Sequence, residues 1–275
     1  MTMAQNPKAS EYAPGDSQRE LARLERQAVF FAGMTRDVLV RGGLKPGMRV
    51  LDLGCGVGDV SMVAAELVGP QGQVRGIDLS PAALSVATRR LAAAGYHQVT
   101  FQQSMIDEFP DFGEFDAIIG RFILVHLADP AETLRHIVSK ARKGVALAFC
   151  ELDLGMTATT KPSPLFDLSV RQIMEVFKRT GRRPDMGSEL FATFRAAALD
   201  PALFAFQHVG SFEEEAGFDF LAESVRSMVP AMEKLGIASA AEVDIETLKD
   251  RLLVEAQGSD ACIFYPRFVG AWARS

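Results

Sequence analysis

The sequence of 275 residues is poor in cysteine, tryptophan and tyrosine, with three, one and three of these residues. The three cysteines, Cys55, Cys150 and Cys262, have no paired spacing, so they imply neither a disulfide framework nor a zinc site. Cys55 and Cys150 lie in apolar, strand-like contexts and are expected to be buried thiols. This cysteine usage fits a reducing compartment, and we expect a cytoplasmic protein.

Long apolar runs and an excess of positive charge are also absent. No apolar run approaches the ~20 residues of a membrane span, and the opening residues, MTMAQNPKAS, lack the apolar segment of a signal peptide. The net charge is −6, which argues against a nucleic-acid partner because phosphates require a basic face. Hydrophobic residues make up 48% of the chain, enough for a sizeable core. The sequence leaves homo-oligomer formation open.

Short apolar segments alternate with helical patterns over the first part of the chain. Such alternation predicts βαβ units and a parallel sheet covered by helices on both faces. We therefore expect an α/β fold that is Rossmann-like and doubly wound, with a mostly parallel seven-stranded sheet. The expected strands are 49–53, 73–77, 99–103, 115–119, 144–150, 203–209 and 262–273, and the helices between the early strands are 59–68, 81–94 and 130–140.

The two ends of the chain depart from this alternation. Residues 1–43 are predicted to form an N-terminal arm followed by lid helices, with one helix from about Ser17 and a second over about 34–41. Residues 44–275 form the main domain. Helical insertions are expected near 155–185 and 213–257, close to the strand ends where ligands of such sheets bind.

The strongest motif is the segment 50–58, Val-Leu-Asp-Leu-Gly-Cys-Gly-Val-Gly. Its glycines permit positive φ and close approach of a ligand, and the next helix offers free N–H groups. Asp78 ends the following strand, 20 residues after Gly58, which is the usual distance for an acid that binds ribose hydroxyls. The combination favours a bound ligand over a ligand-free turn. The spacing differs from the G-x-G-x-x-G of dinucleotide sites, and Asp52 suits a cationic ligand.

Residues 50–58 resemble motif I of class I S-adenosylmethionine methyltransferases, and Gly76-Ile77-Asp78 resembles the acidic motif that follows it. The similarity continues through 115–121 and 144–151. Residues 12–27 resemble the lid helix of bacterial natural-product methyltransferases, a subgroup related to the quinone-biosynthesis type. The resemblance implies S-adenosylmethionine as cofactor. It also implies methyl transfer to an O, N or C atom of a small, lipophilic secondary metabolite.

The resemblance also implies a cofactor site, in which Asp78 binds the ribose and Asp52 lies beneath the glycine loop. Position 105 departs from the family, which commonly has an aspartate there to accept a hydrogen bond from adenine. Met105 can only pack on the ring, which leaves the adenine amino group to Asp107 or to the backbone. The implied cofactor-binding positions are Asp52, Gly54, Gly56, Gly58, Asp78, Leu79, Met105, Ile106, Gly120, Arg121 and Gln27.

Methyl transfer from a sulfonium is a direct displacement that needs mainly alignment and exclusion of water. The candidate catalytic residues are His126 after the fourth strand, Glu151 at the end of the fifth, and Tyr12 in the arm. Each has a plainer alternative: a packing or capping histidine, a solvated loop carboxylate, and a tyrosine in a disordered arm. No metal-ligand cluster is evident, so no metal is expected.

The 19 phenylalanines leave two interpretations open, core packing or an apolar pocket for a lipophilic substrate. Eight of them fall in the lid helix and the insertions: Phe30, Phe31, Phe166, Phe177, Phe191, Phe194, Phe218 and Phe220. Two other functions are compatible with the same cofactor motif. One is a cyclase or isomerase that uses the sulfonium charge without losing methyl, and the other is a non-catalytic cofactor-binding module.

Overall fold

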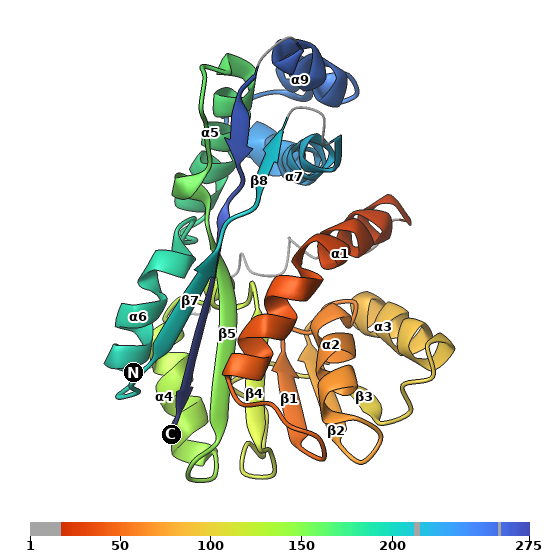
Figure 1. Ribbon diagram of the computed structural model, residues 1–275, viewed down its shortest axis with the longest axis vertical. Helices are drawn as coiled ribbons and strands as arrows, with labels where there is room; N and C mark the ends of the chain where they lie inside the picture. The colour runs from red at the N-terminus through yellow and green to blue at the C-terminus, as the bar shows by residue number, and fades with distance from the viewer. Residues whose placement is uncertain (1–17, 212–214, 258–259) are drawn as a thin grey trace.

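The computed structural model describes residues 18–211, 215–257 and 260–275. Figure 1 shows two lobes, the lower one built on a seven-stranded sheet in the order β3-β2-β1-β4-β5-β10-β7. All its strands run parallel except β10, which is antiparallel to both neighbours, so the predicted mostly parallel sheet is confirmed. The strands are β1 Arg49–Leu53, β2 Gln73–Asp78, β3 Val99–Gln103, β4 Ala117–Arg121, β5 Ala146–Asp153, β7 Ala202–Phe206 and β10 Arg267–Arg274.

Alternating side chains of the central strands enter two separate cores. In β5, for example, Leu147 and Phe149 face one core while Ala146 and Ala148 face the other. This period of two is the geometry of a sheet buried on both faces. One face is covered by α1 (Gln18–Arg41) and α2 (Asp59–Val68), and the other by α4 (Pro130–Lys140) and α6 (Met186–Ala196). A further helix, α3 (Pro81–Ala93), packs along β3.

The N-terminal helix is one continuous element rather than the two segments expected from the sequence. Gly33 lies within α1 and does not break it, since an isolated glycine costs a helix only about 1 kcal/mol relative to alanine. The helix contacts α2, β5 and β10 of the lower lobe and α7 of the upper lobe. It therefore connects the two lobes beside the carboxyl ends of the strands (Figure 1).

Two predicted strands, 203–209 and 262–273, are each divided in the structure. The first gives β7 and β8 (Val209–Ser211), and the second gives β9 (Cys262–Phe264) and β10. Pro266 cannot donate to a sheet, and the Gln207 side chain donates to the Tyr265 carbonyl at 3.0 Å. The two chain segments therefore leave the large sheet together. They join β6 (Ala158–Thr159) in a small sheet of order β6-β9-β8.

The upper lobe combines this small sheet with helices from the two predicted insertions. They are α5 (Pro164–Arg179), α7 (Glu215–Lys234), α8 (Ala240–Val243) and α9 (Leu248–Ala256). A separate hydrophobic cluster, which includes Phe166, Phe218 and Tyr265, fills the space between them. The lobe thus has a core of its own and is joined to the sheet through the paired segments around His208 and Tyr265.

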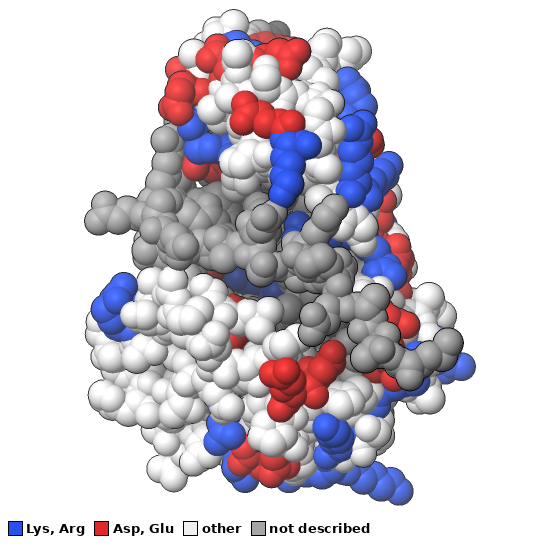
Figure 2. Space-filling model, turned by 180° about the vertical axis from the view of Figure 1, so that it is seen from behind, with Lys and Arg blue, Asp and Glu red and all other residues white. Residues whose placement is uncertain are grey.

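The surface and the buried thiols agree with simple expectations from composition. On the face shown in Figure 2, acidic and basic side chains are interspersed over both lobes. Cys55 and Cys150 are buried, at 6% and 1% exposure, which confirms their predicted placement. Within the described ranges, no helix combines the length and the apolar character that crossing a membrane requires.

Candidate cofactor and active site

The glycine loop leaves the carboxyl end of β1 with three residues in the left-handed region. Gly54, Gly56 and Gly58 have φ values of 63°, 52° and 87°. A Cβ at Gly54 would come within 2.5 Å of Ile123, and one at Gly58 within 2.9 Å of Leu91. At Gly56 a Cβ would meet nothing within 4 Å. Two glycines are therefore required by packing, whereas the backbone at Gly56 borders open space that a ligand can occupy.

Asp52 lies beneath this loop and is buried, at 1% exposure. Its Oδ2 accepts a hydrogen bond from Ser61 Oγ at 2.6 Å, but its Oδ1 has no partner among the described residues. Burial raises the pKa of Asp52 to about 7, against the lowering effects of Ser61 and Arg121. A buried carboxylate oxygen without a donor is costly unless a ligand supplies one, and a cation suits it best.

Asp78, the last residue of β2, is hydrogen-bonded to the glycine loop. Its Oδ2 accepts from the backbone N–H of Gly56 at 2.9 Å, and its Oδ1 accepts from that of Ser80 at 2.9 Å. Each carboxylate oxygen has two lone pairs, and the residue is only half-buried, so both oxygens keep capacity for ligand hydroxyls. Asp78 can therefore fix the loop and bind a ribose at the same time.

The positions predicted to contact the adenine lie at the ends of β2 and β3. Leu79 and Met105 are among the exposed large hydrophobic residues, at 57% and 47%, while Ile106 packs against the lower core. The Gln103 side chain donates to the Leu79 carbonyl at 3.1 Å, and Ser104 Oγ donates to that of Met105 at 2.9 Å. Two exposed apolar side chains next to Asp78 provide a surface on which a flat ring can stack.

Gly120 and Arg121 end β4 directly beside the glycine loop, where Leu53 pairs with Gly120. This strand begins at Ala117, two residues later than the predicted 115–119. Asp116 still contacts Arg49, because its backbone N–H donates to the Arg49 carbonyl at 2.8 Å and its carboxylate accepts the Arg49 N–H at 2.6 Å. Arg121 is buried at the end of this strand. Burial lowers the pKa of its guanidinium, and the carboxylates of Asp59 and Asp52 oppose that effect.

His126 and Glu151 are connected through the backbone of one short helix. Glu151 Oε1 accepts the backbone N–H of Leu124 at 2.7 Å, at the start of the short 3₁₀ helix Leu124–His126. Burial raises the pKa of Glu151 to about 8 despite these backbone donors. His126 ends the same helix and is an exposed residue. Desolvation by the surrounding protein, with a smaller effect of the Arg182 charge, lowers the pKa of its imidazole to about 4.

Two candidates, Tyr12 and the side chain of Gln27, lie outside the described residues. The eight phenylalanines of the lid helix and the insertions differ in their burial. Phe31 is buried, and its ring centroid lies 5.2 Å from that of Phe122 and 5.4 Å from that of Phe268. Phe30 stacks on Phe220 of α7 at 5.6 Å, and both are only half-buried. Buried core positions are Phe166, Phe194 and Phe218, whereas Phe177 is half-buried and Phe191 is exposed.

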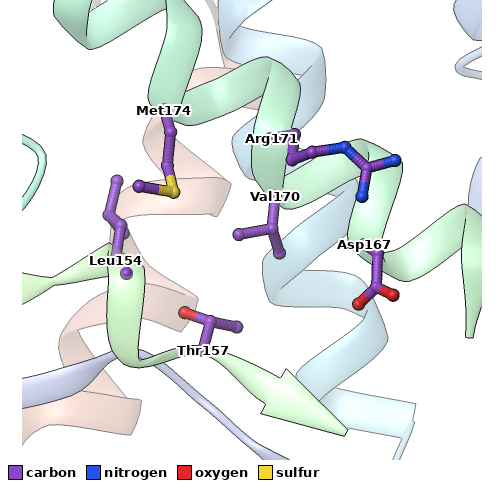
Figure 3. A pocket seen from close by; sticks show the side chains of 7 residues that line it. Leu154, Thr157, Asp167, Val170, Arg171 and Met174 are labelled. Carbon is purple, nitrogen blue, oxygen red and sulfur yellow. The ribbon is translucent and has the colours of Figure 1, made fainter. Parts of the chain in front are cut away.

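A cavity of about 180 Å³ lies away from these residues, between the segment after β5 and one face of α5 (Figure 3). Leu154, Val170 and Met174 form its apolar lining, and Asp167 and Arg171 lie at its edge. None of the predicted site residues that the structure describes borders it. We therefore do not assign it to the cofactor or to the chemistry.

Sequence reasoning missed several residues that the structure brings to the site. Asp59 binds Arg90 at 2.8 Å, and Arg90 Nη1 donates to the Val57 carbonyl in the glycine loop at 2.7 Å. Thr35 of α1 accepts a hydrogen bond from Arg121 at 3.1 Å. Of these residues, only Asp59 could have been noticed from the local sequence, as an acid in the first turn of a helix. The contacts themselves join positions that are 31 to 86 residues apart in the sequence.

A family model described as a methyltransferase domain matches residues 44–183. The demethylmenaquinone methyltransferase of Symbiobacterium thermophilum is 33% identical over 112 residues, which cover 40% of this chain and 44% of that protein. The aklanonic acid methyltransferase of a Streptomyces species is 33% identical over 122 residues, 44% of this chain and 55% of that protein. The chain thus spans about half the length of the curated relatives it matches.

Among solved structures, the YcgJ protein of Bacillus subtilis superposes with a TM-score of 0.57 at 16% identity, over 88% of this chain and 98% of that one. The likeness extends well beyond the segment matched in sequence. It shows the Rossmann-like fold of the whole lower lobe.

Proposed function

The chain belongs to the family of methyltransferase domains, and on that basis we propose that it is an S-adenosylmethionine-dependent methyltransferase acting on a small, lipophilic acceptor. The observation that carries the proposal is the pairing of an open glycine loop with a partnerless buried carboxylate oxygen. Gly56 leaves room for a ligand against the backbone, and Asp52 Oδ1 lacks a donor. A cofactor with an ammonium and a sulfonium charge supplies what both features need.

The residues present fit the ribose, the amino group and the adenine of this cofactor. Asp78 would bind the ribose hydroxyls, Asp52 would face the amino group, and the exposed Leu79 and Met105 would pack on the adenine. When bound, S-adenosylmethionine supplies an electrophilic methyl group on a positively charged sulfur. What remains for the protein is to align the acceptor with that methyl and to exclude water.

A lipophilic acceptor is supported by the aromatic side chains between the lobes and by the names of the relatives. Phe30 and Phe220 are half-buried and stacked where α1 meets α7, beyond the end of β4. The two curated relatives are named for demethylmenaquinone and aklanonic acid, both small molecules. The acceptor atom, O, N or C, is left to experiment.

We assign His126 as the group that can take a proton from the acceptor, and Glu151 as a positioning residue that acts through it. At pH 7 the His126 imidazole is neutral and one ring nitrogen has a free lone pair, but a pKa of about 4 makes it a weak base, which suits only an acceptor that loses its proton readily. The Glu151 carboxyl is tied to the backbone that carries His126.

Glu151→Gln is expected to keep a near-wild-type rate of methyl transfer between about pH 6 and 7.5, because glutamine retains a neutral acceptor for the Leu124 N–H. Glu151→Ala leaves that N–H unpaired, which costs about 1–3 kcal/mol of stability and should slow turnover. The pH–rate profiles of both variants provide the measurement. If glutamine is as damaging as alanine, Glu151 is itself the base and the positioning role is wrong.

Gly56→Ala is expected to weaken S-adenosylmethionine binding by about tenfold or more, because its methyl group would enter the open space at the loop. Gly47→Ala is the matched control, since Gly47 has φ 81° with nothing within 4 Å and lies before β1. Both variants carry a left-handed alanine, which costs about 1–2 kcal/mol. Calorimetric titration should separate them, and equal affinities would show that Gly56 does not line the cofactor.

The test of the whole proposal is a screen of lipophilic acceptors that follows S-adenosylhomocysteine formation. Release of S-adenosylhomocysteine only with an acceptor supports a methyltransferase. Conversion of an acceptor without that product would favour the cyclase or isomerase instead. Tight cofactor binding without any conversion would favour a non-catalytic module.

A further inference from the structure

A hydroxyl group from the N-terminal helix reaches the end of the strand that borders the glycine loop. Thr35, in α1, is fully buried, and its Oγ1 accepts from Arg121 Nη1 at 3.1 Å while donating to the Phe31 carbonyl at 2.8 Å. Arg121 is the last residue of β4. This contact joins α1 directly to the charged side of the candidate cofactor site.

Beyond Thr35, the contacts continue from Arg121 to the glycine loop. Arg121 Nη2 lies 3.8 Å from Asp59 Oδ2, at the start of α2. Asp59 Oδ1 accepts from Arg90 of α3 at 2.8 Å, and Arg90 also donates to the Val57 carbonyl at 2.7 Å. Four elements, α1, β4, α2 and α3, are thus connected to the loop by side-chain contacts.

The Arg121 side chain is only 7% exposed, so its orientation depends on the partners it finds inside the protein. A buried guanidinium is costly unless its N–H donors are paired, and it cannot give up its charge. Its 3.8 Å separation from Asp59 is long for a hydrogen bond, which makes the Thr35 hydroxyl its shorter contact. The hydroxyl therefore fixes where the positive charge lies.

We propose that Thr35 is a positioning residue, which holds the Arg121 guanidinium beside Asp59 and so couples the docking of α1 to cofactor binding. This inference rests on the proposed function of the glycine loop. With α1 docked, Arg121 stabilises the ionised form of Asp52, the form that attracts a cationic cofactor. With α1 displaced, the guanidinium loses this partner and the loop binds the cofactor less tightly.

The charges that face Asp52 fix the direction of the pH effect. The carboxylates of Asp78 and Asp59 favour its protonated form, and the Arg121 cation and the Ser61 hydroxyl favour its ionised form. The nearby Cys55 thiol is buried, and burial raises its pKa, so it stays neutral. Removing the Thr35 hydroxyl weakens the hold on Arg121, which moves the pH dependence of binding upward.

The experiment titrates S-adenosylmethionine into the full chain from about pH 6 to about pH 8.5 and follows Kd by calorimetry. Thr35→Val should raise Kd about tenfold at pH 7 and shift the midpoint of its pH dependence upward. Thr35→Ser keeps the hydroxyl and should behave as the wild type. Thr133→Val is the matched control, since Thr133 is also buried and its Oγ1 donates to the Asp129 carbonyl at 3.2 Å, in α4.

Arg121→Gln keeps the proposal testable if Thr35→Val folds poorly, because unchanged binding in Arg121→Gln alone would also overturn the coupling, and a double-mutant cycle applies where Thr35→Val folds. Arg121→Gln alone should raise Kd and shift the midpoint in the same direction, and adding Thr35→Val should weaken binding no further. Unchanged Kd and midpoint in a folded Thr35→Val, or fully additive effects in the cycle, would overturn the coupling. If the wild type itself does not bind S-adenosylmethionine, the proposed function fails first, which is a distinguishable result.

Discussion

Asp78→Ala is expected to lower the affinity for S-adenosylmethionine by about a hundredfold or more. Two ribose hydroxyls donating to one carboxylate contribute about 1.5–3 kcal/mol each, since hydrogen bonds to charged groups are the stronger kind. The same carboxylate also accepts the N–H of Gly56, so the variant loosens the loop that the cofactor contacts. Both losses act on the same binding step.

The control must lose an equivalent backbone contact at a distance from the site. Asp116→Ala meets this need, because the Asp116 carboxylate accepts the Arg49 N–H at 2.6 Å at the opposite, amino-terminal edge of the sheet. We expect its thermal stability to fall as in Asp78→Ala while its Kd stays that of the wild type. Calorimetric titration with S-adenosylmethionine and S-adenosylhomocysteine is the measurement. Wild-type affinity in a folded Asp78→Ala would remove Asp78 from the cofactor site.

The central part of the fold could be predicted because local signals there agree with the tertiary structure. The segments 49–53, 59–68 and 99–103 have the same bounds in the structure as in the prediction. In each, apolar periodicity and a glycine or a polar turn mark both ends. Asp52, the three loop glycines and Asp78 could be proposed as site residues for a related reason, since the first four lie in one short segment and Asp78 follows at a characteristic spacing.

The remaining features of the fold and of the site depend on contacts between distant segments, which patterns in a single sequence do not reveal. The division of 203–209 and 262–273 follows from hydrogen bonding between Gln207 and Tyr265, and neither segment alone signals where it leaves the sheet. Glu151 directly follows the predicted strand 144–150, as many solvated acids do, yet it lies within β5 and its carboxyl is buried against the N–H of Leu124. Such residues become recognisable only when the elements are placed in space.

Asp52 is the residue at which stability and function oppose each other. The pKa of its carboxyl is about 7 in the folded protein, against an ordinary value of 3.8. A raised pKa means that the folded state holds a proton that the unfolded chain releases more readily. Stability from this group is therefore complete below about pH 4 and is lost as the pH rises to about 7, by an amount on the order of 4 kcal/mol.

Asp52→Asn is therefore expected to raise the melting temperature of the free protein at pH 8, by several degrees, and to have little effect near pH 4, where both side chains are neutral. The same variant should bind S-adenosylmethionine about tenfold or more weakly at pH 8, because it removes the anion that faces the cofactor's positive charge. In the wild type, binding should tighten as the pH rises through about 7 and release protons there, so the calorimetric enthalpy should depend on the buffer.

Ser61→Ala is the companion variant, since it removes the donor to Asp52 Oδ2 but keeps the carboxylate. We expect it to move the midpoint of cofactor binding to higher pH, because the hydroxyl favours the ionised form. Thermal melts of the wild type and both variants at the two pH values measure the effect on stability, and calorimetric titrations over a series from about pH 6 to about pH 8.5 measure the midpoint and the proton release. A loss of stability at pH 8 in Asp52→Asn, or binding without proton release in the wild type, would show that Asp52 is already ionised. The site would then lack the poised acid that the geometry indicates.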